Sequence, residues 1–143
     1  MKIAFVSTRG IPNNYGGFEQ FAENISVGLA ARGHEVVVYS PHFHPYKEDS
    51  YKGVRIKHIY SPETWMGSSV GSFFYDFSSL KDALKREKFD IIFADPPYAL
   101  EGLGDLPDKV FSKDILHPGA YFILEHPEEY NFESNPSRRF PPA

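Results

Sequence analysis

The chain of 143 residues contains no cysteine, so disulfide bonds and thiolate metal sites are excluded. Its apolar runs are all far shorter than the roughly 20 residues that a membrane-spanning helix needs. Basic residues are not in excess, because 15 Lys and Arg stand against 19 Asp and Glu. Proteins that bind DNA or RNA usually carry a positive stripe, so nucleic acid is not an expected partner. These absences favour a cytoplasmic protein without a membrane span.

Segments with strand-like and helix-like patterns alternate along the chain. Apolar runs or period-two alternation predict five strands, at residues 2–7, 34–40, 54–60, 89–94 and 120–125. Helical spacing predicts helices from about Phe18 to Gly33, over 73–88 and, with breaks, over 100–112. In the first helix, Phe18, Phe21, Ala22, Ile25 and Leu29 share one face. Residues 41–52 and 61–71 are expected to be loops.

This alternation predicts an α/β fold of the Rossmann-like, doubly wound kind. We expect a parallel sheet of strand order 3-2-1-4-5 between two helical layers, forming one domain over residues 1–133. The tail over residues 134–143 has no periodicity and is expected to be disordered. In such a sheet, ligands bind at the carboxyl ends of the strands where the strand order reverses, between the first and fourth strands.

The loop after the first strand ends in two glycines directly before the first helix. Gly16 and Gly17 allow a close backbone approach to a phosphate, and the helix N-terminus offers free N–H groups. Glu19 follows in the first helical turn, where a carboxylate also interacts favourably with the helix dipole. Gly16, Gly17 and Glu19 are therefore candidate ligand-binding residues. The alternative is that the two glycines only form a tight strand-to-helix turn.

Three motifs give the first part of the chain a family resemblance. They are Arg9-Gly10-Ile11-Pro12, Tyr15-Gly16-Gly17-Phe18-Glu19 and Gly33-His34-Glu35-Val36. On these motifs, residues 1 to about 88 resemble the N-terminal domain of two-domain retaining glycosyltransferases, near the rhamnosyltransferase-like members. The resemblance implies an acceptor-side domain and a nucleotide sugar as the donor, contacted at Gly16, Gly17 and Glu19. In that family a second domain holds most of the donor nucleotide.

A different motif follows the fourth strand, Asp95-Pro96-Pro97-Tyr98, with Leu116-His117-Pro118-Gly119 and Ile123-Leu124-Glu125-His126-Pro127 after it. With these motifs, residues from about 88 to 131 resemble the C-terminal part of ribosomal-RNA guanine-N2 methyltransferases. That resemblance implies S-adenosylmethionine as cofactor. It also implies that Asp95 and a carbonyl of Pro96 or Pro97 accept the base amine, while Tyr98 stacks on the base. The alternative is a rigid turn fixed by proline.

The methyltransferase cofactor would need a glycine-rich turn after the first strand and an acidic residue at the end of the second. The second strand ends in Tyr39-Ser40-Pro41, without an acid. His42, His44 and His58 do not have the spacing of a metal site, and no metal is expected.

Three hypotheses remain open. The first is a chimera, natural or engineered, that joins the two families near residues 88–92; it has no complete active site, so neither catalysis nor a cofactor is expected. The second is an S-adenosylmethionine-dependent RNA methyltransferase. The third is a nucleotide-sugar glycosyltransferase domain. The sequence favours the first hypothesis. It explains both family resemblances, and it also explains why neither a methyltransferase cofactor loop nor a second glycosyltransferase domain is recognised. An open sheet edge after the last strand also predicts homodimers.

Overall fold

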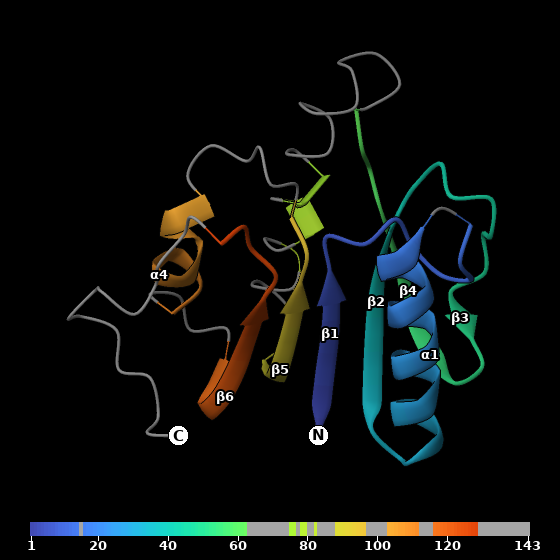
Figure 1. Cartoon of the computed structure of the whole chain (residues 1–143). Helices are drawn as coiled ribbons and strands as arrows, with labels where there is room; N and C mark the ends of the chain where they lie inside the picture. Colours follow the sequence, from blue (N-terminus) through green and yellow to red (C-terminus); the bar gives the residue numbers. More distant parts are fainter. Residues whose placement is uncertain are drawn as a thin grey trace.

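The computed structural model describes residues 1–14, 16–62, 75–76, 78–79, 82, 88–96, 103–111 and 116–128. Its elements are β1 (Lys2–Val6), α1 (Gly17–Ala31), β2 (Glu35–Pro41), β3 (Ser50–Tyr51), β4 (Val54–Ile59), β5 (Phe89–Ala94), the 3-10 helix η1 (Leu103–Asp105), α4 (Leu106–Phe111) and β6 (Leu116–Leu124). They form one sheet with helices packed against it, as Figure 1 shows. The predicted α/β class is therefore confirmed.

The sheet has the order β3-β4-β2-β1-β5-β6. The five strands that the sequence predicts are β4, β2, β1, β5 and β6; all are parallel and stand in the predicted order. The prediction of a loop over residues 41–52 is wrong near its end, because β3 forms a short antiparallel edge strand beside β4 there. Lys52 and Gly53 have φ values of 46° and 84°, so they turn the chain within two residues, as a tight hairpin requires.

Alternate residues of each strand bury their side chains on opposite faces of the sheet. On one face Ile3, Phe5, Val36 and Val38 pack with Ala22 of α1, and the rings of Phe5 and Phe93 stack at 4.8 Å. The second face carries Ala4, Val6, Val37, Tyr39 and Ile92 in its core. At its edge, Val110 of α4 packs with Leu116 and Phe122. Because α1 and α4 cover opposite faces, the layers are those of a doubly wound fold.

Helix α1 faces the sheet through smaller residues than its sequence pattern predicts. Ala22 and Ser26 are fully buried, whereas Phe21 is 42% exposed and Ile25 is 38% exposed. Small side chains at the contact let the helix axis approach the strands closely. Phe21 instead lies at the flank of the helix, where its ring meets the edge of Phe93 at 6.3 Å. The side of α1 that carries Phe21 and Ile25 therefore lies at the margin of the core.

Strand β6 begins earlier than predicted and contains a bulge. Phe89 pairs with Leu116 and Ile91 with Tyr121, so β5 advances by two residues while β6 advances by five. Gly119 lies within this irregular segment with a φ of 81°, which glycine adopts without strain. Regular pairing resumes at Tyr121 and continues to Leu124. The bulge explains why a period-two pattern alone placed the start of the strand near residue 120.

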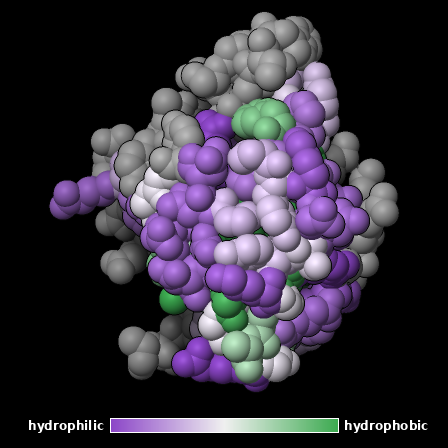
Figure 2. All heavy atoms as spheres, turned by 90° about the vertical axis from the view of Figure 1, so that its right-hand side faces the viewer, coloured by the Kyte–Doolittle hydropathy of each residue, from purple (hydrophilic) through white to green (hydrophobic). Residues whose placement is uncertain are grey.

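Other predictions fall largely outside the described residues. Of the helix expected over 73–88, the described residues 75, 76, 78, 79 and 82 are helical. The loop after residue 62 and the tail over 134–143 lie outside the described part. Among the helices that the structure describes, none is long and apolar enough to cross a membrane. The face beside β3 is mostly hydrophilic, as Figure 2 shows, so this end of the sheet presents little apolar surface.

Candidate active site at the carboxyl edge of the sheet

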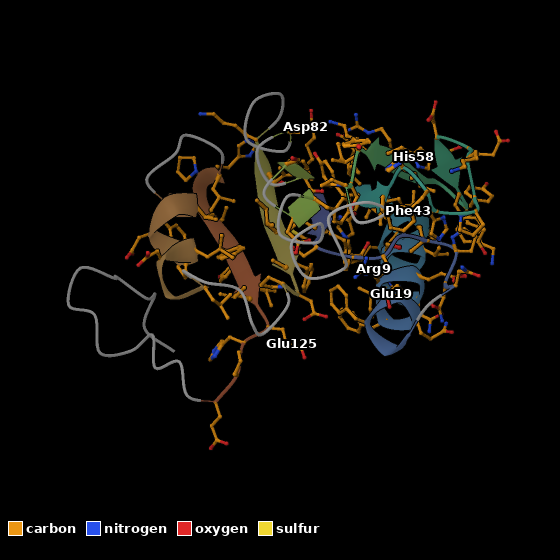
Figure 3. All side chains as sticks on the ribbon, turned by 90° about the horizontal axis from the view of Figure 1, so that it is seen from above. Arg9, Glu19, Phe43, His58, Asp82 and Glu125 are labelled. Atoms are coloured by element: carbon orange, nitrogen blue, oxygen red, sulfur yellow. The ribbon has the colours of Figure 1, made fainter. Side chains whose placement is uncertain are left out.

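The carboxyl ends of β1 and β5 lie side by side where the strand order reverses. β1 pairs with β2 on one side and with β5 on the other, and the helices that follow β1 and β5 pack on opposite faces. Ligands of open α/β sheets bind at such a reversal of strand order, outside the carboxyl ends of the strands. Figure 3 looks down on this edge and labels Arg9, Glu19 and Glu125 around it.

Buried hydrogen bonds hold the loop after β1 in one conformation. The Thr8 hydroxyl donates to the carbonyl of Tyr39 at 2.8 Å and accepts the N–H of Gly10 at 3.0 Å. The Tyr75 hydroxyl lies 2.9 Å from the carbonyl oxygen of Thr8. Gly10 has a φ of 94°, and a Cβ there would lie 2.5 Å from Oγ of Ser40. Gly10 is thus required by the packing of this loop on β2, a role that its sequence context did not reveal.

Glu19 holds the loop from the helix side. It is only 5% exposed, and its Oε1 accepts the backbone N–H of Arg9 at 2.9 Å. One turn later, Oε2 of Glu23 accepts the N–H of Asn13 at 2.7 Å. Carboxylates on α1 therefore satisfy backbone donors of the loop, which keeps its path close to the helix N-terminus.

The two glycines at the start of α1, the N-cap Gly16 and the first helical residue Gly17, differ in their surroundings. Gly16 is the N-cap of α1, and no side-chain hydrogen bond caps the helix there. A Cβ on Gly16 would lie 3.4 Å from Oε2 of Glu19, whereas a Cβ on Gly17 would meet nothing within 4 Å. Internal packing therefore does not require glycine at position 17, and the space beside the first turn of α1 is open on that side.

Asp95 lies at the end of β5 with two other carboxylates near it. Burial, together with smaller contributions from the charges of Glu125 and Glu19, raises the pKa of Asp95 to about 6. Glu125 follows β6, and its N–H donates to the carbonyl of Ala94 at 2.9 Å, which holds it beside the end of β5. We call Glu19, Asp95 and Glu125 the carboxylate group. It accepts hydrogen bonds from hydroxyls and repels phosphates.

The remaining residues of the predicted methyltransferase motif are only partly described. Pro96 is buried directly after Asp95, while Pro97 and Tyr98 lie outside the described residues. At the end of β2, where the cofactor ribose would need an acid, stands the fully buried Ser40. The loop after β1 packs closely against it, because a Cβ on Gly10 would lie 2.5 Å from its Oγ. The end of β2 therefore does not fit a ribose.

Three aromatic side chains meet at the same edge of the sheet, beyond the loop after β1. The ring of His42 stacks on that of Tyr60 at 4.8 Å and meets the edge of Phe43 at 5.4 Å. His42 and Phe43 follow β2, and Tyr60 follows β4, so parallel pairing of these strands brings the rings together. We call this set the aromatic platform. The sequence could not reveal it, because 16 residues separate Phe43 from the next aromatic member in the chain, Tyr60.

The histidines of this region bind protein groups. His44 is buried; its Nδ1 accepts the N–H of Tyr46 at 3.2 Å, which leaves Nε2 to donate to the carbonyl of Pro12 at 3.1 Å. Burial lowers the pKa of His44, so it is held neutral. Nε2 of His58 lies 3.2 Å from the carbonyl oxygen of Glu48. Among the described residues, no three His, Asp or Glu side chains, the carboxylate group included, are placed so that they could hold a metal ion.

The chain matches one family of known proteins over most of this region. The family model described as Glycosyltransferase Family 4 matches residues 15–105, which include α1, β2, β4 and β5. The matched range covers more than half of the chain, and it extends across residues 88–92 and over Asp95-Pro96-Pro97-Tyr98. No curated protein and no solved structure matches the chain.

Proposed function

Because the chain belongs to Glycosyltransferase Family 4, we propose that it is the acceptor-side domain of a nucleotide-sugar glycosyltransferase. The observation that carries this proposal is the carboxylate group at the carboxyl edge of the sheet. Sugar hydroxyls donate hydrogen bonds, and carboxylates are their strong acceptors. A neutral, hydroxyl-rich acceptor fits this edge better than a ligand whose phosphates lie beside three acidic side chains.

We assign the donor nucleotide a smaller contact with this chain than the acceptor. In the two-domain enzymes that the first part of the chain resembles, a second domain holds most of the donor. We therefore propose that Gly16 and Gly17 contact only a phosphate of the donor, where the uncapped N–H groups of the first turn of α1 attract an anion against the repulsion of the nearby Glu19. On this proposal the residues described here supply the acceptor side of the site, and a second domain of the kind these enzymes use supplies most of the donor side.

The methyltransferase alternative is favoured by one observation. Asp95 lies at the carboxyl end of β5, beside β1, where an Asp-Pro-Pro-Tyr motif would present its carboxylate to a base. The close packing of the loop after β1 on Ser40 is unfavourable for the ribose of S-adenosylmethionine. A chimera joined near residues 88–92 stays a hypothesis. It predicts the same fold without catalysis, because a protein with an incomplete active site can fold and still be inactive.

Thermal unfolding distinguishes these functions. We expect methyl glycosides at high concentration to raise the unfolding temperature, and S-adenosylmethionine to leave it unchanged. A ligand present at a hundred times its dissociation constant stabilises the folded state by about 2.7 kcal/mol, which is a rise of several degrees. In Asp95→Asn the response to glycosides should be weaker. A rise with S-adenosylmethionine that Asp95→Asn abolishes would overturn the glycosyltransferase proposal in favour of the methyltransferase.

We further propose that β6 supports weak homodimers. It is the end strand of the sheet, and Tyr121 and Ile123 are 58% and 45% exposed. The bulge limits regular pairing to Tyr121–Leu124, so only a short edge is open to a second copy. Light scattering at increasing concentration should show a monomer–dimer equilibrium that Tyr121→Lys shifts to monomer. A monomeric mass at every concentration contradicts it.

A further inference from the structure

Within the aromatic platform (His42, Phe43 and Tyr60), backbone hydrogen bonds hold His42 in place. The N–H of Ser61 donates to Nδ1 of His42 at 3.0 Å, and the N–H of His42 donates to the carbonyl of Ile59 at 2.8 Å. The ring of His42 is thereby oriented before any ligand arrives, with its proton on Nε2. A preorganised surface loses little conformational entropy when it binds a ligand.

The platform nevertheless exposes much of its aromatic surface. Tyr60 is 61% exposed and Phe43 is 40% exposed, although both are large and apolar. An aromatic ring has a negatively polarised face, which attracts the positively polarised C–H groups of a flat ligand. The sugar ring of a glycoside presents such C–H groups on its apolar face and hydroxyls around its rim. Because His42 stacks on one side of Tyr60 and stands edge-on to Phe43, the exposed part of Tyr60 is the surface suited to one face of a sugar ring.

A hydrogen bond and close packing connect the platform with the loop that Glu19 holds. His44, next to Phe43, binds the carbonyl of Pro12 at 3.1 Å, and a Cβ on Gly10 would lie 2.9 Å from its ring. The N–H of Arg9, in the same loop, binds Glu19. In Figure 3, Phe43, Arg9 and Glu19 follow one another around the carboxyl edge. A ligand on the platform is thus close to the loop that leads to the carboxylate group.

We propose that the aromatic platform stacks against the C–H face of an uncharged sugar ring of the acceptor, with Tyr60 as its main contact. This inference rests on the proposed function, because it assigns a subsite to the acceptor. An uncharged ring is favoured over the base of a nucleotide, because the phosphates of a nucleotide would lie towards the carboxylate group. Lys47 donates to the carbonyl of His42, so its charge is already engaged on the backbone side of the platform.

Saturation-transfer NMR with methyl glycosides of rhamnose, glucose and galactose tests the subsite. Saturating the aromatic protons of the protein should transfer signal to the C–H groups of one sugar face. Tyr60→Leu keeps apolar bulk and removes the ring, and it should weaken binding about two- to tenfold, the value of a lost aromatic contact. Phe111→Leu is the matched control, because Phe111 is an aromatic residue with a similar exposure of 58%, on α4; binding should not change.

Each other outcome has a defined meaning. If glycosides bind equally well to wild type and Tyr60→Leu, the acceptor site lies elsewhere: the inference fails and the proposed function stands. If no glycoside binds to the wild-type chain, both fail. If uridine diphosphate binds and Tyr60→Leu weakens it while glycosides are unaffected, the platform holds a base, which also overturns the inference. Unchanged thermal unfolding of Tyr60→Leu confirms that the variant is folded.

Discussion

The backbone N–H of Arg9 donates a hydrogen bond of 2.9 Å to Oε1 of Glu19, across ten residues of sequence. This bond links the loop after β1 to the first turn of α1. The side chain of Glu19, which accepts the bond, is almost fully buried. Glu19 therefore has a structural role whether or not it also contacts a ligand. The role assigned to it in binding must be tested with variants that separate the two effects.

Glu19→Ala is expected to lower the free energy of unfolding by about 1–3 kcal/mol, because it leaves the Arg9 N–H without its acceptor. Glu19→Gln keeps an acceptor oxygen and should cost less. Urea unfolding measures both. If the two variants are equally destabilised, charge rather than the hydrogen bond is what the loop requires, and the structural assignment of this bond is wrong.

Gly10→Ala should be strongly destabilising. The positive φ of 94° is unfavourable for alanine, and the added Cβ would lie 2.5 Å from Oγ of Ser40, within the core. Gly17→Ala is the control, because its Cβ would meet nothing within 4 Å and the position is helical. We expect Gly17→Ala to be neutral or to stabilise by up to about 1 kcal/mol. A Gly10→Ala protein with the wild-type unfolding temperature would contradict this loop conformation.

The titration of Asp95 should make stability fall as the pH rises. Burial, Glu125 and Glu19 raise its pKa in the folded protein from 3.8 to about 6. Between these values the folded state binds more protons than the unfolded state, so the stabilisation is fully present below pH 3.8 and is lost by about pH 6. At most about 3 kcal/mol is involved, and water that screens the partly exposed group reduces it.

Asp95→Asn provides the control for this effect, because it removes the titrating group. The difference in free energy of unfolding between Asp95→Asn and wild type, measured by urea unfolding from pH 4 to 7.5, should grow in favour of the variant as the pH rises. Taking the difference removes the contribution of His44, whose lowered pKa acts in the opposite direction in wild type and variant alike. A difference that does not change with pH would show that Asp95 is solvated.

The orientation of α1 makes Ala22 and Ile25 a sensitive pair. Ala22 is fully buried against the sheet, and Ile25 is 38% exposed. Ala22→Leu should therefore destabilise by about 1–3 kcal/mol through overpacking. Ile25→Ala should cost less than the roughly 2–5 kcal/mol of a fully buried isoleucine. If thermal unfolding showed that Ala22→Leu is tolerated while Ile25→Ala costs as much as a fully buried isoleucine, the side of α1 that carries Phe21 and Ile25 would face the core, and the orientation would be wrong.

Local patterns in the sequence were sufficient for most of the fold. Continuous apolar runs identified β1, β2 and β5, because strands covered on both faces need apolar side chains on both. Alternation with helices then required right-handed crossovers, which left few possible strand orders. The glycine pair at the start of α1 and the end of that helix were also readable, since capping is a local property.

Packing decided what local patterns could not. The rotation of α1 about its axis depends on which of its faces approaches the sheet most closely. The small residues Ala22 and Ser26 face the sheet, and the larger Phe21 and Ile25 do not. The bulge in β6 depends on its pairing with β5. The candidate site depends on strand adjacency: Glu19, Asp95 and Glu125 come from three distant parts of the chain, and so do the two sides of the aromatic platform. Sequence determined which side chains were available, and the parallel sheet determined which of them meet, because it places all of its carboxyl ends at one edge.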